Sequence, residues 1–215
     1  MRLIENYNII KKKIQNANSH SNVELIVISK NQQIPKISYL IEKTQHVHFG
    51  ENKLQEAITK WPDLKTKYKN IKLHFIGRLQ SNKVKDVVKH FDYIHSIDSL
   101  SLATKCSEEE KKIKKMLGYF IQINFDDEPQ KSGINFNKAS DLFVYCKQNL
   151  QLNIIGLMCI PPVYKDSEIY FKKLKLLADD LKIKDLSMGM SNDYESAIQN
   201  GSTFVRIGSK IFGED

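Results

Sequence analysis

A lysine near the start of the chain follows a short apolar segment and has the chemistry to form an imine with an aldehyde. Residues 25–28 read Leu-Ile-Val-Ile, and Lys30 comes two residues later. A β-branched apolar run of this length is typical of a parallel strand covered on both faces. Because side chains alternate along a strand, Ile26, Ile28 and Lys30 are predicted to point the same way. Lys30 is then either a side chain that reaches out to water or an amine used for covalent chemistry.

Two serines near the other end of the chain have the surroundings of a phosphate site. Ser191 ends the run Met-Gly-Met-Ser, and Ser209 ends the run Arg-Ile-Gly-Ser. Glycine lets the backbone approach an anion closely, a serine adds a hydroxyl donor, and the amides that open a following helix complete the site. The alternative is helix capping, with Ser191 or Asn192 as the N-cap and Glu195 completing a capping box.

The segments around these residues alternate between strand-like and helix-like patterns along the whole chain. Strands are predicted at about 24–29, 46–50, 72–77, 93–98, 119–124, 154–160, 186–190 and 204–208. An opening helix carries Leu3, Tyr7, Ile10 and Ile14 on one stripe. Eight strands alternating with helices predict a parallel sheet with right-handed crossovers, and eight is the number that closes a (β/α)8 TIM barrel. An open doubly wound sheet is the alternative, but no Gly-x-Gly-x-x-Gly follows any strand.

A single (β/α)8 barrel over residues 1–215, with an extra N-terminal helix, would bring the candidate residues to one rim. Chemistry in such barrels lies at the carboxyl ends of the strands, and phosphate often binds after strands seven and eight. Lys30 would then face an opposing phosphate site made by Ser191, Gly208 and Ser209. Arg206 lies two residues before Gly208, so it shares the face of that residue and is predicted to point toward the barrel mouth. The alternative is an arginine that forms an ion pair with an interior carboxylate. A lysine that faces a phosphate site suits a phosphorylated aldehyde held as an imine, and pyridoxal phosphate is the clearest candidate.

Composition argues against several other classes of protein. The net charge is +8, but 30 of the 33 basic residues are lysines, and they are spread along the chain without an aromatic-rich basic segment, so nucleic-acid binding is not expected. No segment has the length of a membrane span, and no signal peptide opens the chain. Three widely spaced cysteines form neither a disulfide framework nor a metal pattern, which favours the cytoplasm and predicts no metal site.

Other polar residues in the predicted strands are less suggestive of chemistry. His48, His74 and His95 alternate with apolar residues and are interpreted as hydrogen-bonded core or rim histidines. Glu51 and Asp98 are interpreted as partners that support the site residues. They are less suited to be an acid/base pair, because nothing in the sequence fixes the distance between them. The loop 126–133 follows strand five and is either a lid over the site or an ordinary polar connection.

The chain resembles the YggS/PROSC family of pyridoxal-phosphate-binding homeostasis proteins over nearly its whole length. The matching stretches are 28–30, 49–52, 74–77, 79–83, 97–98, 121–124, 131–134, 156–158, 186–191, 205–208 and 211–213. So many ordered matches are far more specific than any single motif. The resemblance implies a fold-type III barrel like the N-terminal domain of alanine racemase.

The resemblance also implies a role for each matching residue. Lys30 matches the lysine that forms the Schiff base, and Asn52 matches an asparagine near the cofactor's ring hydroxyl. Arg206 matches an arginine that faces the pyridine nitrogen. Ser191, Gly208 and Ser209 match the phosphate-binding positions, where the family often has threonine in place of Ser209. Asn31 replaces a usual threonine next to the lysine, which is a mild departure.

The expected function is to hold pyridoxal 5'-phosphate and to buffer it or deliver it to apoenzymes. The alternative is an amino-acid racemase-like enzyme. Racemases of that type use a tyrosine from a second domain of the partner subunit, for which the sequence after strand eight leaves no room, so a monomer without catalytic residues is expected. An arginine at the ring nitrogen also makes the cofactor a weaker electron sink. Arginine occurs there in true racemases as well, so this lowers activity without abolishing it, and the missing domain is the stronger argument. A third hypothesis is a phosphosugar isomerase, which would need a carboxylate base and no imine.

Overall fold

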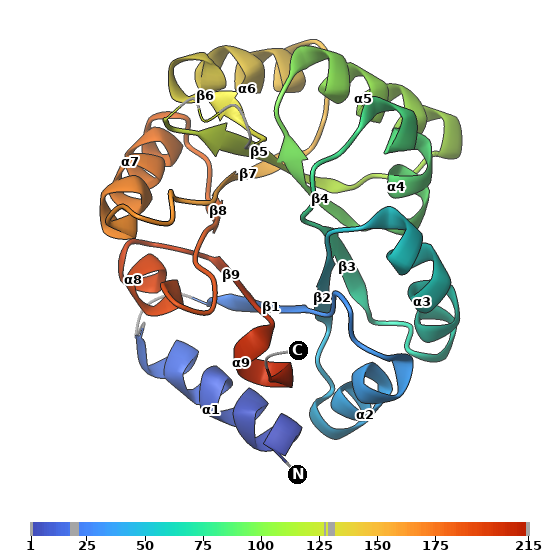
Figure 1. The fold of residues 1–215 in the computed structure, drawn as a ribbon. Coiled ribbons are helices and arrows are strands. Elements are labelled where there is room, and N and C mark those ends of the chain that lie inside the picture. Colours follow the sequence, from blue (N-terminus) through green and yellow to red (C-terminus); the bar gives the residue numbers. More distant parts are fainter. Residues whose placement is uncertain (1, 18–21, 127, 129–131, 214–215) are drawn as a thin grey trace.

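The strands of the protein form a closed parallel barrel, and helices surround it. A computed structural model describes residues 2–17, 22–126, 128 and 132–213, and Figure 1 shows helices around a central ring of strands. The strands are β1 (Glu24–Ile28), β2 (His48–Glu51), β3 (Lys72–Phe75), β4 (Tyr93–Ile97), β5 (Gly118–Asn124), β6 (Ile134–Asn135), β7 (Ile154–Cys159), β8 (Asp185–Ser187) and β9 (Phe204–Ile207). The helices are α1 (Arg2–Ala17), α2 (Ile34–Thr44), α3 (Leu54–Lys67), α4 (Val84–His90), α5 (Leu100–Ile113), α6 (Ala139–Gln148), α7 (Ser167–Asp180), α8 (Tyr194–Gln199) and α9 (Ser209–Phe212).

The order of the strands confirms the (β/α)8 TIM barrel. Strands β1 to β5, β7, β8 and β9 follow one another around the ring, and β1 pairs with β9 to close it. All these pairings are parallel, as right-handed β-helix-β units require. Because β9 is the neighbour of β1, the segment after β9 lies beside the segment that carries Lys30 on the rim. The expectation that Gly208 and Ser209 lie across the barrel from Lys30 was therefore wrong. Phosphate binding by these residues stays a prediction.

Alternation along the strands separates an interior core from an outer one. Ile26 and Ile28 point inward, where they pack with Phe120, Met158 and Phe204. Leu25 and Val27, between them, belong to the larger cluster that joins the strands to the helices. This is the period of two that the apolar segment of β1 predicted.

Two elements lie outside the simple eight-unit pattern. The N-terminal helix α1 is present as expected, and Tyr7, Ile10 and Ile14 are its buried residues. It packs against α8 and α9. The short strand β6 pairs with β5 outside the barrel ring and was not predicted. Within the described residues, no helix is long and apolar enough to cross a membrane.

Candidate functional site

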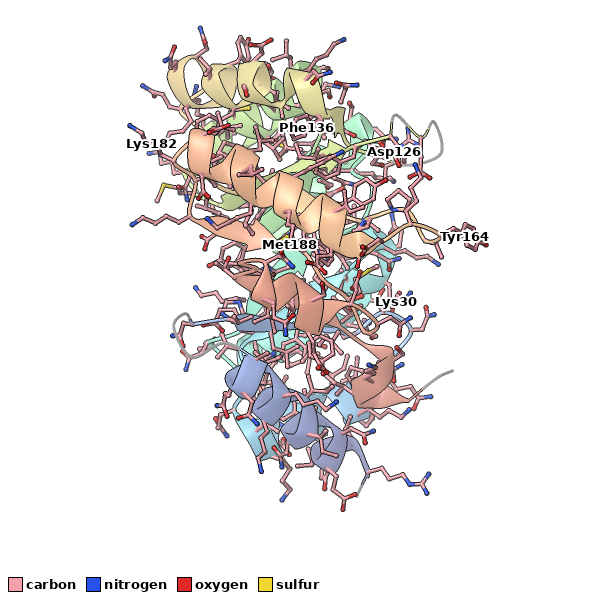
Figure 2. The ribbon with its side chains drawn as sticks, turned by 90° about the vertical axis from the view of Figure 1, so that its left-hand side faces the viewer. Lys30, Asp126, Phe136, Tyr164, Lys182 and Met188 are labelled. Carbon is pink, nitrogen blue, oxygen red and sulfur yellow. The ribbon has the colours of Figure 1, made fainter. Side chains whose placement is uncertain are left out.

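All six predicted site residues line one cavity at the carboxyl ends of the strands. The cavity has a volume of about 680 Å³, and its walls include Lys30, Asn52, Ser191, Arg206, Gly208 and Ser209. In Figure 2, Lys30, Asp126 and Tyr164 lie toward one end of the barrel, and Lys182, which precedes β8, lies toward the other. The fold therefore brings together residues that are up to 179 positions apart in the sequence.

Lys30 lies just beyond the end of β1, at the mouth of the cavity. Its side chain is exposed, and the next residue, Asn31, has a φ of 60°. Asparagine tolerates this left-handed conformation better than most residues, so the turn after Lys30 suits the residue found there. No ion pair among the described residues includes Lys30. Its amine is therefore available to a ligand in the cavity.

A buried ion pair behind β1 anchors the backbone that carries Lys30. Glu51 is fully buried, and its Oε1 accepts hydrogen bonds from Ser29 Oγ at 2.7 Å and from Trp61 Nε1 at 2.9 Å. Lys60 Nζ lies 2.7 Å from the same carboxylate oxygen and donates to the carbonyl of Ser29 at 2.7 Å. Burial raises the pKa of Glu51, and Lys60 opposes that rise. Glu51 thus positions the segment before Lys30, the supporting role that the sequence suggested.

Asn52 lines the cavity and carries a buried hydrogen-bond acceptor without a donor among the described residues. Its Oδ1 atom is buried, and none of the described residues donates to it. Gly77 packs directly against the same residue, because a Cβ at position 77 would lie 2.1 Å from the carbonyl oxygen of Asn52. A buried acceptor without a donor is costly, so this atom fits a ligand that carries a hydroxyl or N–H group.

Ser191 and Ser209 come together, and the structure excludes the capping alternative for Ser191. Ser209 Oγ donates to Ser191 Oγ at 3.1 Å. Helix α8 begins at Tyr194 with Asp193 as its N-cap, and Glu195 bonds to Tyr194 and Lys13 in place of a capping box. The two hydroxyls, next to Gly208, form a group of small polar atoms that suits a phosphate.

Arg206 is buried in the barrel interior and makes no ion pair among the described residues. Its side chain donates to Ser187 Oγ at 2.7 Å and to the carbonyl of Cys159 at 3.0 Å. Burial lowers the pKa of Arg206, yet an arginine remains charged in proteins. The guanidinium group is thus a fixed cation in the floor of the cavity, and the interior carboxylate of the ion-pair alternative is not found among its contacts.

Three histidines behind Arg206 form a connected chain that the sequence interpretation missed. His48 and His74 are joined by a 2.8 Å hydrogen bond, His74 and His95 by one of 2.9 Å, and His95 and Ser187 by one of 2.9 Å. They are hydrogen-bonded interior histidines, as expected, but their bonds are to one another. Their one sequence signal is that each sits in a successive predicted strand at an inward position. Among the described residues no group of His, Cys, Asp or Glu is arranged to hold a metal ion.

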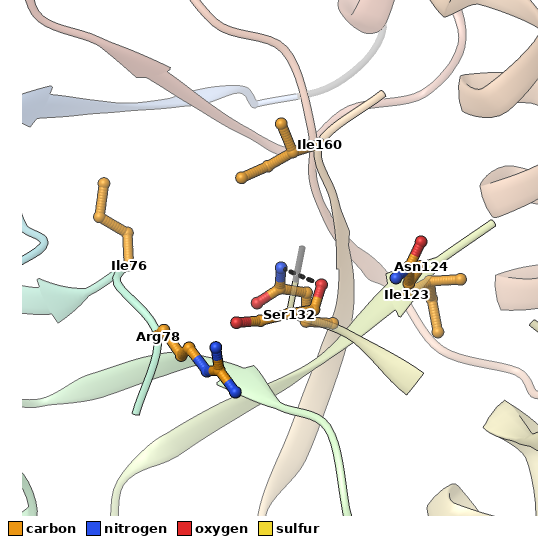
Figure 3. Close-up of a pocket in the computed structure, with 7 residues that line it drawn as sticks. Ile76, Arg78, Ile123, Asn124, Ser132 and Ile160 are labelled. Atoms are coloured by element: carbon orange, nitrogen blue, oxygen red, sulfur yellow. Dashed lines mark hydrogen bonds between the residues drawn. The ribbon is translucent and has the colours of Figure 1, made fainter. Parts of the chain in front are cut away.

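A smaller cavity of about 260 Å³ adjoins the first. The two share Ile76 and Ile160, and Figure 3 shows the Arg78 side chain reaching into this second space. Gln122 Nε2 donates to the carbonyl of Ser132 at 2.9 Å along its wall. The suggested lid falls partly on residues 127 and 129–131, which lie outside the described residues. Asp126, at its start, is bonded to Lys165 and Tyr170.

Comparisons with known proteins agree with this fold and set of residues. A family model described as alanine racemase, N-terminal domain, matches residues 2–215. A pyridoxal phosphate homeostasis protein of Pasteurella multocida is 37% identical, with 99% of this chain and 97% of that protein covered. One from Aquifex aeolicus is 38% identical over 77% of this chain and 76% of that protein.

Solved structures show the same barrel. PipY of Synechococcus elongatus, solved without PLP, has a TM-score of 0.90 and 30% identity, over 98% of this chain and all of that chain. The same protein with PLP bound has a TM-score of 0.88 and 29% identity over the same shares of the two chains. An alanine racemase of Clostridium difficile shares the fold with a TM-score of 0.75 at 16% identity, over 98% of this chain and 57% of that protein. The chain therefore belongs to the alanine racemase N-terminal domain family, and within it to the family of the pyridoxal phosphate homeostasis proteins.

Proposed function

We propose that this protein binds pyridoxal 5'-phosphate through Lys30 and takes part in the homeostasis of that cofactor. The observation that carries the proposal is the single cavity that joins a lysine amine, two adjacent serine hydroxyls and a buried arginine. Relatives named for pyridoxal phosphate homeostasis, and a PLP-bound PipY structure, support it.

The residues of the cavity match the polar groups of the cofactor. The aldehyde of pyridoxal phosphate condenses reversibly with a lysine amine, which is the chemistry that the cofactor supplies. Ser191, Ser209 and the backbone at Gly208 would hold the phosphate. Asn52 has a buried acceptor with no donor, which fits the cofactor's ring hydroxyl. Arg206 would face the ring nitrogen, where its fixed positive charge keeps that nitrogen from taking up a proton.

This arrangement favours holding the cofactor over using it. A ring nitrogen without a proton withdraws electrons weakly, so carbanion chemistry on a bound amino acid would be slow. Release to a client apoenzyme would require Lys30 to give up the aldehyde, either to water or to the client's own lysine. We further propose that residues 1–215 act as one domain and as a monomer in the cytoplasm, where the three buried free cysteines would stay reduced.

The test is an absorbance spectrum of the purified protein with pyridoxal phosphate, followed by borohydride reduction and peptide mapping. We expect visible absorbance and a reduced cofactor attached to Lys30. Lys30→Ala should lose both. A Lys30→Ala protein that still carries covalent cofactor would refute the assignment.

Lys165 provides a matched control. It lines the same cavity, but its amine is paired with Asp126 at 3.0 Å. Lys165→Ala should therefore keep the visible absorbance and the covalent attachment at Lys30. Loss of both signals in this variant would show that Lys165 itself is required for covalent attachment, which the proposal excludes.

Two assays separate the carrier from the racemase-like alternative. The loaded protein should transfer pyridoxal phosphate to an apoenzyme and restore its activity. Racemization of free alanine that disappears in Lys30→Ala would instead establish an enzyme.

A further inference from the structure

The interior of the barrel contains one continuous line of hydrogen bonds that ends at Arg206. It runs from Arg206 through Ser187, His95 and His74 to His48, with donor–acceptor distances of 2.7, 2.9, 2.9 and 2.8 Å. Beyond His48, the Nε2 atom lies 3.9 Å from Oε2 of Glu24. The line thus links a buried cation at the cavity to a carboxylate at the amino-terminal end of β1.

The chemistry of its two ends fixes the direction in which protons are donated. Arg206 can only donate, so Ser187 Oγ accepts from it and is free to give its own proton to Nδ1 of His95. His95 then carries its proton on Nε2 and donates to Nδ1 of His74. His74 in turn donates from Nε2 to Nδ1 of His48, which leaves the His48 Nε2 proton toward Glu24.

If the histidines donated their protons in the opposite direction, toward Arg206, two groups would lack a suitable partner. Ser187 would accept from both Arg206 and His95, and its own proton would need another acceptor. At the far end, the lone pair of His48 Nε2 would face the carboxylate of Glu24. In the forward order Ser187, His95 and His74 each accept one hydrogen bond and donate one. His48 accepts one and turns its Nε2 proton toward Glu24.

In the forward order the neutral rings are dipoles aligned between opposite charges. Each ring turns its Nδ1 lone pair toward Arg206 and its Nε2 proton toward Glu24. Aligned hydrogen bonds in a low-dielectric interior polarise one another, so the line carries an electrostatic link between two charges that do not touch.

Burial keeps the rings neutral, as this alignment requires. His74 and His95 are fully buried, and burial lowers the pKa of each well below its usual value, with Arg206 adding to the effect on His95. The pKa of His48 is also lowered, chiefly by burial. Glu24 and Asp92 oppose that shift, and Lys72 and Lys11 add to it.

Flat aromatic contacts hold two of the rings in this arrangement. The His74 ring stacks on Tyr93 with 4.3 Å between ring centroids, and the His95 ring stacks on Phe120 with 4.1 Å. The rings are therefore fixed in plane and in position, which a merely space-filling role would not need.

We propose that His48, His74 and His95 are positioning residues that, with Ser187, link Arg206 to Glu24 and hold the guanidinium in the orientation that the cofactor meets. This inference rests on the proposed function for the identity of the ligand, but the ordered line exists without it. His74 does not touch Arg206, so its effect on the cavity can only pass through its neighbours.

The first test is nitrogen NMR of the histidine rings in the protein without cofactor. We expect three rings protonated at Nε2 at about pH 8, and signals of His74 and His95 that do not change between about pH 5 and pH 8, whereas an ordinary histidine titrates in that range. A ring protonated at Nδ1, or a charged His74 or His95 at about pH 6, would overturn the proposal. Because this measurement needs no cofactor, it stands even if the protein fails to bind pyridoxal phosphate.

The second test compares two substitutions at the centre of the line. His74→Phe keeps a flat ring against Tyr93 but removes the donor and the acceptor, whereas the amide of His74→Gln retains both. We expect His74→Phe to weaken pyridoxal phosphate binding by about fivefold or more, the lower range for couplings between linked sites, and to shift the visible absorbance. His74→Gln should restore both. Equal affinity and equal spectra for the wild type and His74→Phe would refute the link.

A third variant tests the far end without disturbing the interior. Glu24 is partly exposed, and Glu24→Gln removes its charge while keeping its size. The nitrogen signals of His74 should shift in this variant, although Glu24 does not contact that ring. Circular dichroism and melting curves show whether each variant is folded, and an unchanged His74 signal in folded Glu24→Gln would contradict the electrostatic link.

Discussion

At the residue scale, the candidate site separates two tasks between two kinds of side chain. Lys30 offers an amine at the mouth of the cavity, while Ser191 and Ser209 offer hydroxyls that already bond to each other. An amine can capture an aldehyde whether or not a phosphate is present. The hydroxyls, in contrast, are proposed to recognise only the phosphate, so substitutions can separate capture of the aldehyde from recognition of the phosphate.

Removing one serine hydroxyl should weaken binding of pyridoxal phosphate without preventing capture by Lys30. We expect Ser191→Ala and Ser209→Ala each to raise the dissociation constant by about tenfold or more, since tenfold is the lower end for one hydrogen bond to a charged group. The double variant should lose less than the product of the two effects, because the hydroxyls contact each other. Absorbance titration measures all three constants.

Pyridoxal, which lacks the phosphate, is the control ligand for these variants. Its affinity should stay within about twofold of the wild-type value, because pyridoxal has no phosphate for the hydroxyls to bind and substitutions away from a ligand's contacts have small effects. Equal losses for pyridoxal and pyridoxal phosphate would show that the serines shape the cavity and do not recognise the phosphate.

At the element scale, helix α3 supports the loop after β1 through one buried lysine. Lys60 compensates the charge of Glu51 and holds the carbonyl of Ser29, one residue before Lys30. Removing one partner of a buried ion pair leaves the other charge uncompensated, at a cost of about 3–5 kcal/mol. We expect Lys60→Met to lower the free energy of unfolding at neutral pH by that amount, as measured by urea unfolding.

The same variant should regain stability as the pH falls. Burial raises the pKa of Glu51, so the folded protein binds this proton more tightly than the unfolded chain does. Stability from this group therefore falls as the pH rises from the unfolded pKa to the raised one. Without Lys60 the rise is larger, so the penalty of Lys60→Met should be greatest at neutral pH and smaller in acid.

Lys65 on the same helix is the matched control. Its pair with Asp92 is partly exposed, so Lys65→Met should cost about 1 kcal/mol or less. A penalty for Lys60→Met that is no larger than this, or that does not change with pH, would contradict the role assigned to the buried pair.

The sequence predicted the barrel and the rim residues because both follow from local patterns. Apolar runs locate strands, and strand ends meet at one rim whatever the details of packing. The histidine line could not be predicted, because it joins His95 on β4 to Ser187 on β8 across the barrel interior. Which inward side chains meet there depends on the curvature and register of the closed sheet. Likewise, spacing allowed Ser191 to cap a helix, but that helix begins three residues later, at Tyr194.

At the scale of the whole molecule, ligand binding should stabilise the barrel. A ligand that binds only the folded state adds about 2.7 kcal/mol at a hundred times its dissociation constant. For a domain of this size, each kcal/mol raises the melting temperature by about 2–4 °C. We therefore expect pyridoxal phosphate to raise the melting temperature of the wild type by about 5–11 °C. Lys30→Ala should show a much smaller rise, and equal rises in scanning calorimetry would count against capture by this lysine.

The seam between the first and last strands has a consequence for synthesis of the protein. Strand β1, which leads to Lys30, pairs with β9, and α1 contacts α9, which starts at Ser209. While β9 is still inside the ribosome, β1 has an open edge and the hydroxyl of Ser209 is absent. The side of the cavity that we propose to bind phosphate is therefore complete only after translation has passed β9. We expect a partly made chain to bind pyridoxal phosphate more weakly than the finished barrel does.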